Sequence, residues 1–394
     1  MIKLSSRKDK ISKLLTRGVE EIIDFDHLQS RLSSGEKLRI KMGIDPTSPN
    51  FHLGHLIPLL KLRDFQELGH QIVLIIGDFT GLIGDTSDKE SERPMLDDSS
   101  VQKNSETYIE QAGKIIDIKK TEVHRNSEWL APLDYLEIGR QADLFSLNEF
   151  ISRENIDRRM KNGRRVSLRE LLYPLMQAYD SVQVKADVEL GGTDQRFNLL
   201  AGRDMQKFYQ QDPQDILTGP LLEGLDGRKM SASYGNTINL IDEPRDMFGK
   251  VMSLRDDLII KYFTLLTRVE LNRINEYEIK LKQGANPRDF KLELAFEIVS
   301  VCYSDAEAIS AKDYFIKTFS QKEIPADMPS LKPKNYNIIE VLLESNMVSS
   351  RAEAKRIIKQ GGVKINECTV KDFDSTIPNG SVLRKGKINF LKIE

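Results

Sequence analysis

The chain has 394 residues, of which 39% are hydrophobic and 30% charged, and its formal net charge is −2. This composition is typical of a folded globular protein and excludes a disordered one. The length predicts two or three domains. No apolar run approaches the roughly 18 residues that a membrane-spanning helix needs, and charges interrupt the N-terminal apolar residues, so we expect neither a membrane partner nor a secretory signal.

The two cysteines, Cys302 and Cys368, are far apart in the sequence and form no CxxC pair. This spacing argues against a disulfide framework and against a thiolate zinc site. It fits a reducing compartment, and we therefore expect a cytoplasmic protein.

The N-terminal half predicts an α/β domain. Amphipathic helices are expected up to about residue 35, followed by a short strand in "KLRIKMGID", a helix after "HLGH" and a buried strand in "HQIVLIIGD". A strand, a glycine turn, a helix and a second strand form a βαβ unit with a parallel sheet and a right-handed crossover. A polar loop (78–94), helices (99–116 and 167–179), and a strand, Gly-Gly turn and helix (182–200) are expected next.

The character of the sequence changes after residue 243. Residues 244–321 are rich in Lys, Glu and Leu with helical patterning, and 322–335 hold three prolines and read as a linker. Residues 336–394 predict a compact α+β unit. We therefore expect a Rossmann-type parallel-sheet domain (1–243), an α-helical domain (244–321), the linker (322–335) and a small α+β domain (336–394).

The segment "MGIDPTSPNFHLGH" places His52 and His55 beside Gly54 at the start of a predicted helix. Four interpretations are open: a zinc site, proton transfer, contact with a phosphate, or simple packing. Zinc needs a third ligand, and no nearby His, Cys or HExxH pattern supplies one. A glycine allows close backbone approach and a helix N-terminus favours an anion, so phosphate contact is a natural alternative.

Two further motifs carry polar groups. "KMSAS" (229–233) would be an ordinary solvated loop if it stood alone. In "YPLMQAYD", the spacing puts Tyr173, Gln177 and Asp180 on one helix face, and such polar groups on an apolar helix need partners. "GGTDQ" (191–195) follows across a turn.

Together, "HLGH" and "KMSAS" resemble the HIGH and KMSKS signatures of class I aminoacyl-tRNA synthetases. With "YPLMQAYD", "GGTDQ", "GIDPT" and "GLIGD", the chain resembles the tyrosyl-tRNA synthetases over nearly its whole length. This resemblance implies activation of L-tyrosine by ATP to tyrosyl-adenylate, with release of pyrophosphate, and transfer of tyrosine to tRNA(Tyr). It also implies Mg²⁺ accompanying ATP without a dedicated protein metal site, and a homodimer.

The resemblance implies a role for each matching residue. Tyr173, Gln177 and Asp85 would hold the α-ammonium of tyrosine, with Asp180 at the phenol hydroxyl and Gln195 near the carboxylate. The nucleotide would be contacted by Asp45, Thr47, Gly54 and Asp194. The phosphates, the adenosine and the leaving pyrophosphate would be contacted by His52, His55, Lys229, Ser233, Lys89 and Arg93. A site that reads a hydroxyl rejects phenylalanine, and this family is itself the standard example of that selectivity.

Two basic stretches are candidate tRNA contacts. The first is either a solvated surface run or a contact to the tRNA acceptor end, and contains Arg158, Arg159, Lys161, Arg164 and Arg165. The second belongs to a tail (331–394) with 12 Lys and Arg against 7 Asp and Glu. This tail resembles an S4-type RNA-binding domain, with Arg351, Lys355, Arg356 and Lys359 on one side of a helix. We expect no DNA partner.

Two positions depart from the better-known bacterial pattern of the family. Ala232 replaces the second lysine of KMSKS, and Lys41 stands where many members have a tyrosine that contacts the substrate hydroxyl. Three alternatives therefore stay open: a tryptophan-specific synthetase, an RNA-binding relative without catalysis, and a small-molecule adenylyltransferase.

Overall fold

The computed structural model describes residues 6–85, 97–320, 328–386 and 389–394. The chain forms two compact units, residues 1–308 and 309–394, which are described separately. Within the described ranges, none of the helices combines the length and apolar character needed to cross a bilayer.

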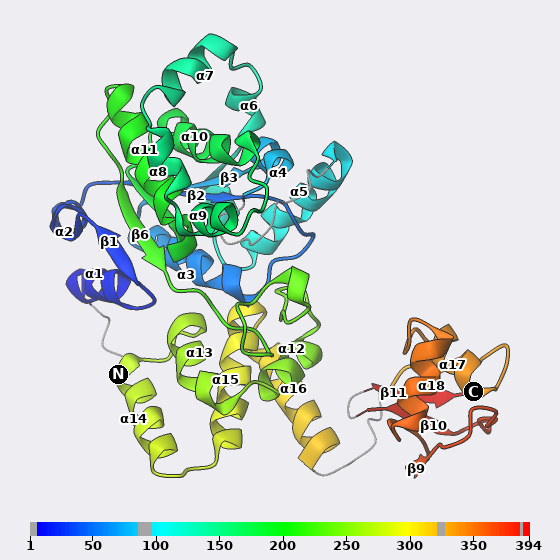
Figure 1. Cartoon of the computed structure of the whole chain (residues 1–394). Helices are drawn as coiled ribbons and strands as arrows, with labels where there is room; N and C mark the ends of the chain where they lie inside the picture. Colours follow the sequence, from blue (N-terminus) through cyan, green and yellow to red (C-terminus); the bar gives the residue numbers. More distant parts are fainter. Residues whose placement is uncertain (1–5, 86–96, 321–327, 387–388) are drawn as a thin grey trace. The chain divides into compact units, whose positions relative to one another are not determined.

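The first unit is built on a six-stranded sheet, shown in Figure 1. Its order is β1-β6-β5-β2-β3-β4. All neighbouring strands are parallel except β1 and β6. The strands are β1 (Glu21–Ile23), β2 (Arg39–Ile44), β3 (Gln71–Ile76), β4 (Thr121–Arg125), β5 (Val188–Gly192) and β6 (Asp215–Gly219). The predicted parallel α/β sheet is confirmed, and the short antiparallel edge strand β1 is an addition to it.

The connections change direction between β2 and β5. From β2 the chain continues outward through β3 and β4, and it later returns on the other side of β2 with β5 and β6. In a parallel sheet, such a switch point opens a crevice beyond the carboxyl ends of the strands. The residues that follow β2, β3 and β5 therefore converge there.

Helices cover the sheet and continue below it in Figure 1. In the first part of the unit they are α1 (Arg7–Thr16), α2 (Phe25–Ser34), α3 (Leu53–Glu67), α4 (Asp78–Ile83), α5 (Asp98–Gly113), α6 (Ser127–Leu130), α7 (Tyr135–Ala142), α8 (Leu147–Ile151), α9 (Glu154–Lys161), α10 (Leu168–Gln183) and α11 (Arg196–Phe208). After β6 follow α12 (Pro244–Met252), α13 (Ile259–Leu266), α14 (Leu271–Lys282) and α15 (Pro287–Cys302). Helix α16 (Asp305–Phe315) begins in the first unit and continues into the second. Short 3-10 turns occupy Ile118–Lys120, Thr193–Gln195, Ala232–Tyr234 and Asp256–Leu258 of the first unit, and a π-helical turn occupies Ile316–Ser320 of the second.

Several short elements were not predicted. Helix α4 lies in the segment expected to be a polar loop, and α6 to α9 contain only four to eight residues each. Elements of this length show little periodicity, and side-chain caps at their first turns, such as Ser146 and Asp134, define where they begin. The division expected after residue 243 falls where α12 begins at Pro244, inside the first compact unit.

The second unit contains a five-stranded sheet of order β7-β11-β10-β8-β9. Its elements are β7 (Ser330–Leu331), α17 (Ile338–Glu344), α18 (Arg351–Lys359), β8 (Val363–Ile365), β9 (Cys368–Thr369), β10 (Val382–Lys385) and β11 (Asn389–Ile393). Apolar residues of both helices and of the sheet, among them Leu342, Ile358 and Leu383, form one buried core. The predicted small α+β architecture with its own sheet is confirmed.

Candidate functional site

A cavity of about 360 Å³ lies at the switch point of the first unit. Every predicted tyrosine- or nucleotide-contacting residue within the described ranges lines it: Asp45, Thr47, His52, Gly54, His55, Asp85, Tyr173, Gln177, Asp180, Asp194, Gln195, Lys229 and Ser233. Lys89 and Arg93 fall outside the described residues. Residues from distant parts of the sequence thus line one cavity.

His52 is the N-cap of α3 and forms a capping arrangement with His55. The Gly54 N–H donates to His52 Nδ1 at 3.1 Å, and the His52 N–H donates to His55 Nδ1 at 3.2 Å. Because Nδ1 accepts in both rings, Nε2 carries the proton and can donate. A Cβ atom on Gly54 would lie 2.8 Å from His52 Cε1, so only glycine leaves the His52 ring in this position.

Both imidazoles are neutral at ordinary pH. Burial, followed by the neighbouring His55 and Lys229, lowers the pKa of His52 to about 2. Burial also lowers the pKa of His55 to about 4. A general acid or base works best with a pKa near the working pH, so these values disfavour proton transfer. The geometry favours two neutral N–H donors directed at an anionic ligand.

Asp180 is a buried carboxylate that neutral groups hold in place. Trp129 Nε1 donates to Oδ1 at 2.8 Å, and Asn126 Nδ2 donates to Oδ2 at 3.2 Å. Burial raises the pKa of Asp180 to about 6, against the opposing charge of Lys41 and these two hydrogen bonds. Sequence reasoning missed both donors, although Trp129 is the only tryptophan and Asn126 follows the carboxyl end of β4.

Tyr173, two turns closer to the start of α10 than Asp180, contacts a second carboxylate. Its hydroxyl donates to Asp45 Oδ2 at 2.9 Å, and Thr80 Oγ1 donates to Asp45 Oδ1 at 2.7 Å. Burial, followed by the charge of Asp45, holds the pKa of Tyr173 well above its usual value. Asp45 and Tyr173, which lie far apart in the sequence, are therefore directly joined in the cavity wall.

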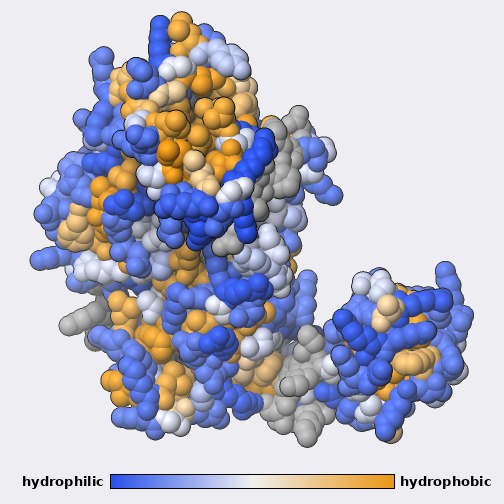
Figure 2. Space-filling model, in the orientation of Figure 1, coloured by the Kyte–Doolittle hydropathy of each residue, from blue (hydrophilic) through white to orange (hydrophobic). Residues whose placement is uncertain are grey.

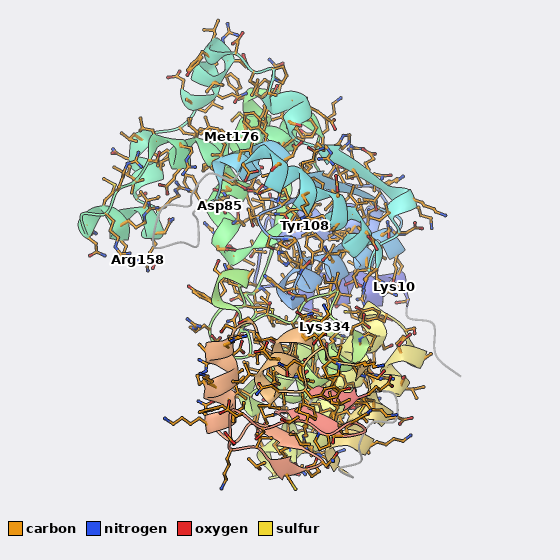
Figure 3. All side chains as sticks on the ribbon, turned by 90° about the vertical axis from the view of Figure 1, so that its right-hand side faces the viewer. Lys10, Asp85, Tyr108, Arg158, Met176 and Lys334 are labelled. Carbon is orange, nitrogen blue, oxygen red and sulfur yellow. The ribbon has the colours of Figure 1, made fainter. Side chains whose placement is uncertain are left out.

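A chain of carboxamides connects the remaining predicted tyrosine-contacting residues. Gln195 Nε2 donates to Asp85 Oδ2 at 2.6 Å. Asn198 Nδ2 donates to Gln177 Oε1 and to Gln195 Oε1, both at 3.0 Å. Figure 3 labels Asp85 in the part of the first unit where Met176 marks α10. Asn198, on α11, was not singled out from the sequence because its role depends on the packing of α11 against α10.

The KMSAS loop contributes one ammonium group to the cavity. Lys229 Nζ lies 3.0 Å from Asp194 Oδ2, which joins the loop to the residues after β5. Ser233 is exposed at the edge of the cavity in the turn Ala232–Tyr234. The neighbouring Arg228 is paired with Asp226 and packs over Tyr234, and it does not line the cavity.

The basic residues at α9 differ in exposure. Arg158, Lys161, Arg164 and Arg165 are exposed, and Figure 3 shows Arg158 at the outer edge of the first unit. Arg159 is only 1% exposed, and its guanidinium pairs with Glu170 at 2.5 Å. The expectation that Arg159 contacts tRNA is therefore wrong: its charge is used inside the fold to join α9 to α10.

The predicted basic side of the second unit is exposed on α18. Its members are Arg351, Lys355, Arg356 and Lys359. Arg351 also pairs with Glu340 of α17 at 2.8 Å, and the Lys355 ammonium lies 6.0 Å from the centre of the Phe373 ring. The helix thus presents a row of cations to solvent.

One group of described residues outside the cavity has ligand atoms close enough for a metal ion: Asp24, His27 and Asp215. His27 Nδ1 lies 2.9 Å from Asp215 Oδ1, and Arg203 lies 3.8 Å from Asp24. The imidazole and the guanidinium thus already contact these carboxylates. We therefore interpret this group as packing between α2 and β6.

Comparison with known proteins covers both units. Residues 33–320 match the family "tRNA synthetases class I (W and Y)", and residues 320–393 match "Tyrosine--tRNA ligase SYY-like C-terminal domain". The chain is 47% identical over 386 residues to the tyrosine–tRNA ligase of Thermotoga maritima, covering 97% of this chain and 96% of that protein. It is 44% identical over 393 residues to tyrosine–tRNA ligase 2 of Clostridium acetobutylicum, covering 98% of each.

Solved structures share the fold at lower sequence identity. A C-terminally truncated mitochondrial tyrosyl-tRNA synthetase of Coccidioides posadasii is 22% identical with a TM-score of 0.64, over 77% of this chain and 91% of that one. The tyrosyl-tRNA synthetase of Archaeoglobus fulgidus, complexed with L-tyrosine, is 23% identical with a TM-score of 0.62, over 78% of this chain and all of that one. At this identity the likeness establishes the fold.

The neutral state of the two α3 histidines can be measured directly. In a histidine NMR titration of the full chain, we expect the ring signals of His52 and His55 to stay unchanged between about pH 8 and pH 5, since their pKa values are about 4 or lower. His52→Gln and His55→Gln assign the two signals. A titration of either ring near its ordinary pKa of 6.5 would contradict this geometry.

Proposed function

We infer the activity from one premise: the chain belongs to the class I tRNA synthetases of the tryptophan and tyrosine family. It is a tyrosine–tRNA ligase, which activates L-tyrosine with ATP to tyrosyl-adenylate, releases pyrophosphate and transfers tyrosine to the 3′ end of tRNA(Tyr). A tryptophan-specific enzyme and an RNA-binding relative without catalysis are not favoured, because full-length relatives are tyrosine–tRNA ligases.

The observation that carries tyrosine specificity is the buried Asp180 carboxylate. The hydrogen bonds from Trp129 and Asn126 leave further lone pairs on its oxygens, which a phenol hydroxyl can use. Phenylalanine would leave this acceptor without its partner in a buried site, which is costly. Asp180 therefore reads the hydroxyl of the substrate.

The opposite end of the amino acid carries an ammonium and a carboxylate. The ammonium needs acceptors, and the oxygens of Tyr173, Gln177 and Asp85 supply them. Gln195, whose Nε2 already donates to Asp85, lies next to this group and near the substrate carboxylate. With its ammonium held in this way, the substrate directs its own carboxylate towards the nucleotide.

Activation proceeds by attack of that carboxylate on the α-phosphorus of ATP, with pyrophosphate leaving in line. Negative charge grows on the phosphate oxygens, and donors that meet it only in the transition state accelerate the step. His52 supplies a neutral N–H to the phosphates and His55 one to the adenosine side. Lys229 and Ser233 supply donors from a loop, and Asp194 holds the ribose hydroxyls with Asp45, Thr47 and Gly54 beside the nucleotide.

Mg²⁺ enters with ATP in this proposal. The cavity carboxylates Asp45, Asp85 and Asp194 each already accept a hydrogen bond or ion pair from a neighbouring side chain. The described part of the cavity therefore suits an ion carried by the phosphates better than one held by the protein alone. The ion would neutralise charge on the leaving pyrophosphate.

The tRNA is bound by surfaces outside the cavity. We assign the exposed cations of α18 to RNA phosphates, and the exposed Arg158, Lys161, Arg164 and Arg165 to the acceptor end. The helices after residue 243 form the anticodon-binding part. The protein works in the cytoplasm, where tRNA and ATP are available.

The functional unit is a homodimer in this proposal. Large apolar side chains are exposed along α7 to α10, and Figure 2 shows an apolar area on this part of the surface. They are Tyr135 (94% exposed), Leu136, Leu147, Met160, Leu168 (78% exposed) and Leu172. A contiguous apolar patch on a folded protein indicates an interface, and a two-fold contact would bury the same patch on both copies.

The amino-acid dependence of ATP–pyrophosphate exchange tests the activity. We expect exchange with tyrosine and none with tryptophan or phenylalanine. In Asp180→Asn, kcat/KM for tyrosine should fall about 10- to 100-fold, as expected for a lost hydrogen bond to a charged group. Exchange driven by tryptophan, or no exchange from folded wild-type protein, would overturn the assignment.

A matched variant separates the two half-reactions. Arg356 lies on α18 in the second unit and does not line the cavity, and Arg356→Glu reverses its charge. It should leave tyrosine-dependent exchange unchanged and reduce transfer of tyrosine to tRNA. An equal loss of both activities would contradict the separate role of α18.

The oligomeric state tests the apolar patch. Analytical ultracentrifugation of the wild type should give twice the mass of the chain, and Leu168→Glu should shift the population to monomer because a charge cannot be buried there without a partner. Ile279→Glu replaces a comparably exposed apolar residue on α14 and should leave the dimer intact. A monomeric wild type, or loss of the dimer in Ile279→Glu alone, would refute this interface.

A further inference from the structure

Lys41 does not face the cavity, although the sequence places it where relatives contact the substrate. Its side chain is fully buried, and its Nζ lies 2.9 Å from Glu189 Oε1, which is 1% exposed. Lys41 on β2 and Glu189 on β5 are directly paired across the two parallel strands. Neither residue lines the cavity, so Lys41 does not take the place of the hydroxyl-contacting tyrosine of the family pattern.

The ion pair is completely surrounded by hydrogen-bond partners. Lys41 Nζ also donates to the Gln177 carbonyl at 2.9 Å and to Ser181 Oγ at 2.7 Å. Glu189 Oε1 accepts from Gln177 Nε2 at 3.1 Å, and Oε2 accepts from Ser181 Oγ at 3.0 Å and from Gln214 Nε2. A buried pair is tolerated when it is satisfied in this way, and it constrains the groups around it.

The chemistry of a carboxylate fixes the orientation of Gln177. A carboxylate only accepts hydrogen bonds, so the carboxamide of Gln177 must turn its nitrogen towards Glu189. The oxygen Oε1 is then directed to the other side, where Asn198 Nδ2 donates to it at 3.0 Å. A carboxamide oxygen has two lone pairs, so one remains for a ligand in the cavity that Gln177 lines.

The orientation continues along the wall of the cavity. Asn198 Nδ2 donates to Gln195 Oε1 as well, which leaves Gln195 Nε2 directed at Asp85. The carboxylate of Glu189 thus determines which end of each carboxamide faces the ligand. An ammonium ligand needs oxygens, and a reversed Gln177 would present an N–H₂ group to it.

We propose that Lys41 and Glu189 form a positioning pair for the amino-acid site, which turns the carboxamide oxygen of Gln177 towards the α-ammonium of tyrosine. This inference rests on the proposed function, because it requires tyrosine to bind in this cavity. Lys41 supplies the positive charge without which the Glu189 carboxylate could not be buried. The pair acts through Gln177 and touches no substrate.

The test compares ligands that differ in one charged group. Lys41→Met combined with Glu189→Met removes the pair with little change in side-chain length and leaves no lone buried charge. We expect the Kd of tyrosine and of tyramine to rise about 10- to 100-fold, the range for a hydrogen bond to a charged group. The Kd of 3-(4-hydroxyphenyl)propionate, which lacks the ammonium, and the KM for ATP should stay within about threefold of the wild type.

Two further variants distinguish positioning from general damage. Lys41→Met with Glu189→Gln restores a carboxamide oxygen as acceptor for Gln177, and should recover part of the tyramine affinity. Asp215→Asn neutralises another fully buried carboxylate, on the adjacent strand β6, and should leave the ratio of tyramine to propionate binding unchanged. Thermal unfolding of each variant confirms that it is folded.

The outcomes separate this inference from the proposed function. If the wild type binds neither tyrosine nor tyramine, the proposed function fails. If the wild type binds both and the paired methionine variant weakens all three ligands equally, or weakens none, the positioning pair is refuted. If the paired methionine variant does not fold, Lys41→Met with Glu189→Gln is compared with the wild type and with Glu189→Gln alone. The positioning pair would also be refuted if the tyramine and propionate affinities of this variant equalled those of the wild type and its tyramine affinity did not exceed that of Glu189→Gln.

Discussion

The cavity depends on a buried carboxylate that is held by hydrogen-bond donors without a cation in direct contact. Burial raises the pKa of Asp180 from its ordinary 3.8 to about 6, a difference of about 3 kcal/mol at about 1.36 kcal/mol per unit. Between these two values the folded chain binds the proton and the unfolded chain does not, so stability decreases as the pH rises through this window. At neutral pH the folded state is therefore destabilised by the full burial of the ionised Asp180 carboxylate.

Neighbouring elements limit that cost and define the site. Trp129 of α6 and Asn126 at the end of β4 hold the two oxygens, and the charge of Lys41 acts at longer range against that of Glu189. These groups come from both sides of the switch point between β2 and β5. A parallel sheet with this strand order is therefore the scaffold that allows one carboxylate to be buried, oriented and left with lone pairs for a ligand.

Charge is distributed along the cavity according to what each part of the reaction needs. Acceptors surround the amino-acid end, with Asp180 for the hydroxyl and Gln177 for the ammonium. Neutral imidazole donors and Lys229 stand at the nucleotide end, where negative charge develops. Because the pKa values of His52 and His55 are lowered by burial, their contribution does not change across the pH range in which Asp180 titrates.

The sequence allowed the cavity residues to be predicted wherever a motif or a helical period fixes them. Tyr173, Gln177 and Asp180 share one face of α10, and the histidines lie at the first turn of α3. It did not reveal partners that depend on how elements pack. Lys41 and Glu189 are separated by most of the domain in sequence and meet only when β5 returns beside β2, and Asn198 acts through the contact of α11 with α10.

The same limitation explains the error at Arg159. A basic run indicates a charged surface. Only the packing of α9 on α10 shows that Arg159, one residue of this run, is buried in an ion pair with Glu170. Short elements such as α4 and α6 escaped prediction for a related reason, since their few residues are stabilised by neighbouring elements more than by their own periodicity.

The most direct test of this account is the pH dependence of tyrosine binding, measured by calorimetry between about pH 5 and pH 8. Between about pH 5 and pH 7 tyrosine keeps its ammonium, its carboxylate and its neutral phenol, so a change there reports on the protein. The account predicts a constant Kd above about pH 7 and a Kd that rises towards tenfold per pH unit below the Asp180 pKa of about 6. This dependence should be absent in Asp180→Asn. A flat profile for the wild type, or an identical profile in Asp180→Asn, would contradict the claim that the ionised Asp180 carboxylate reads the hydroxyl.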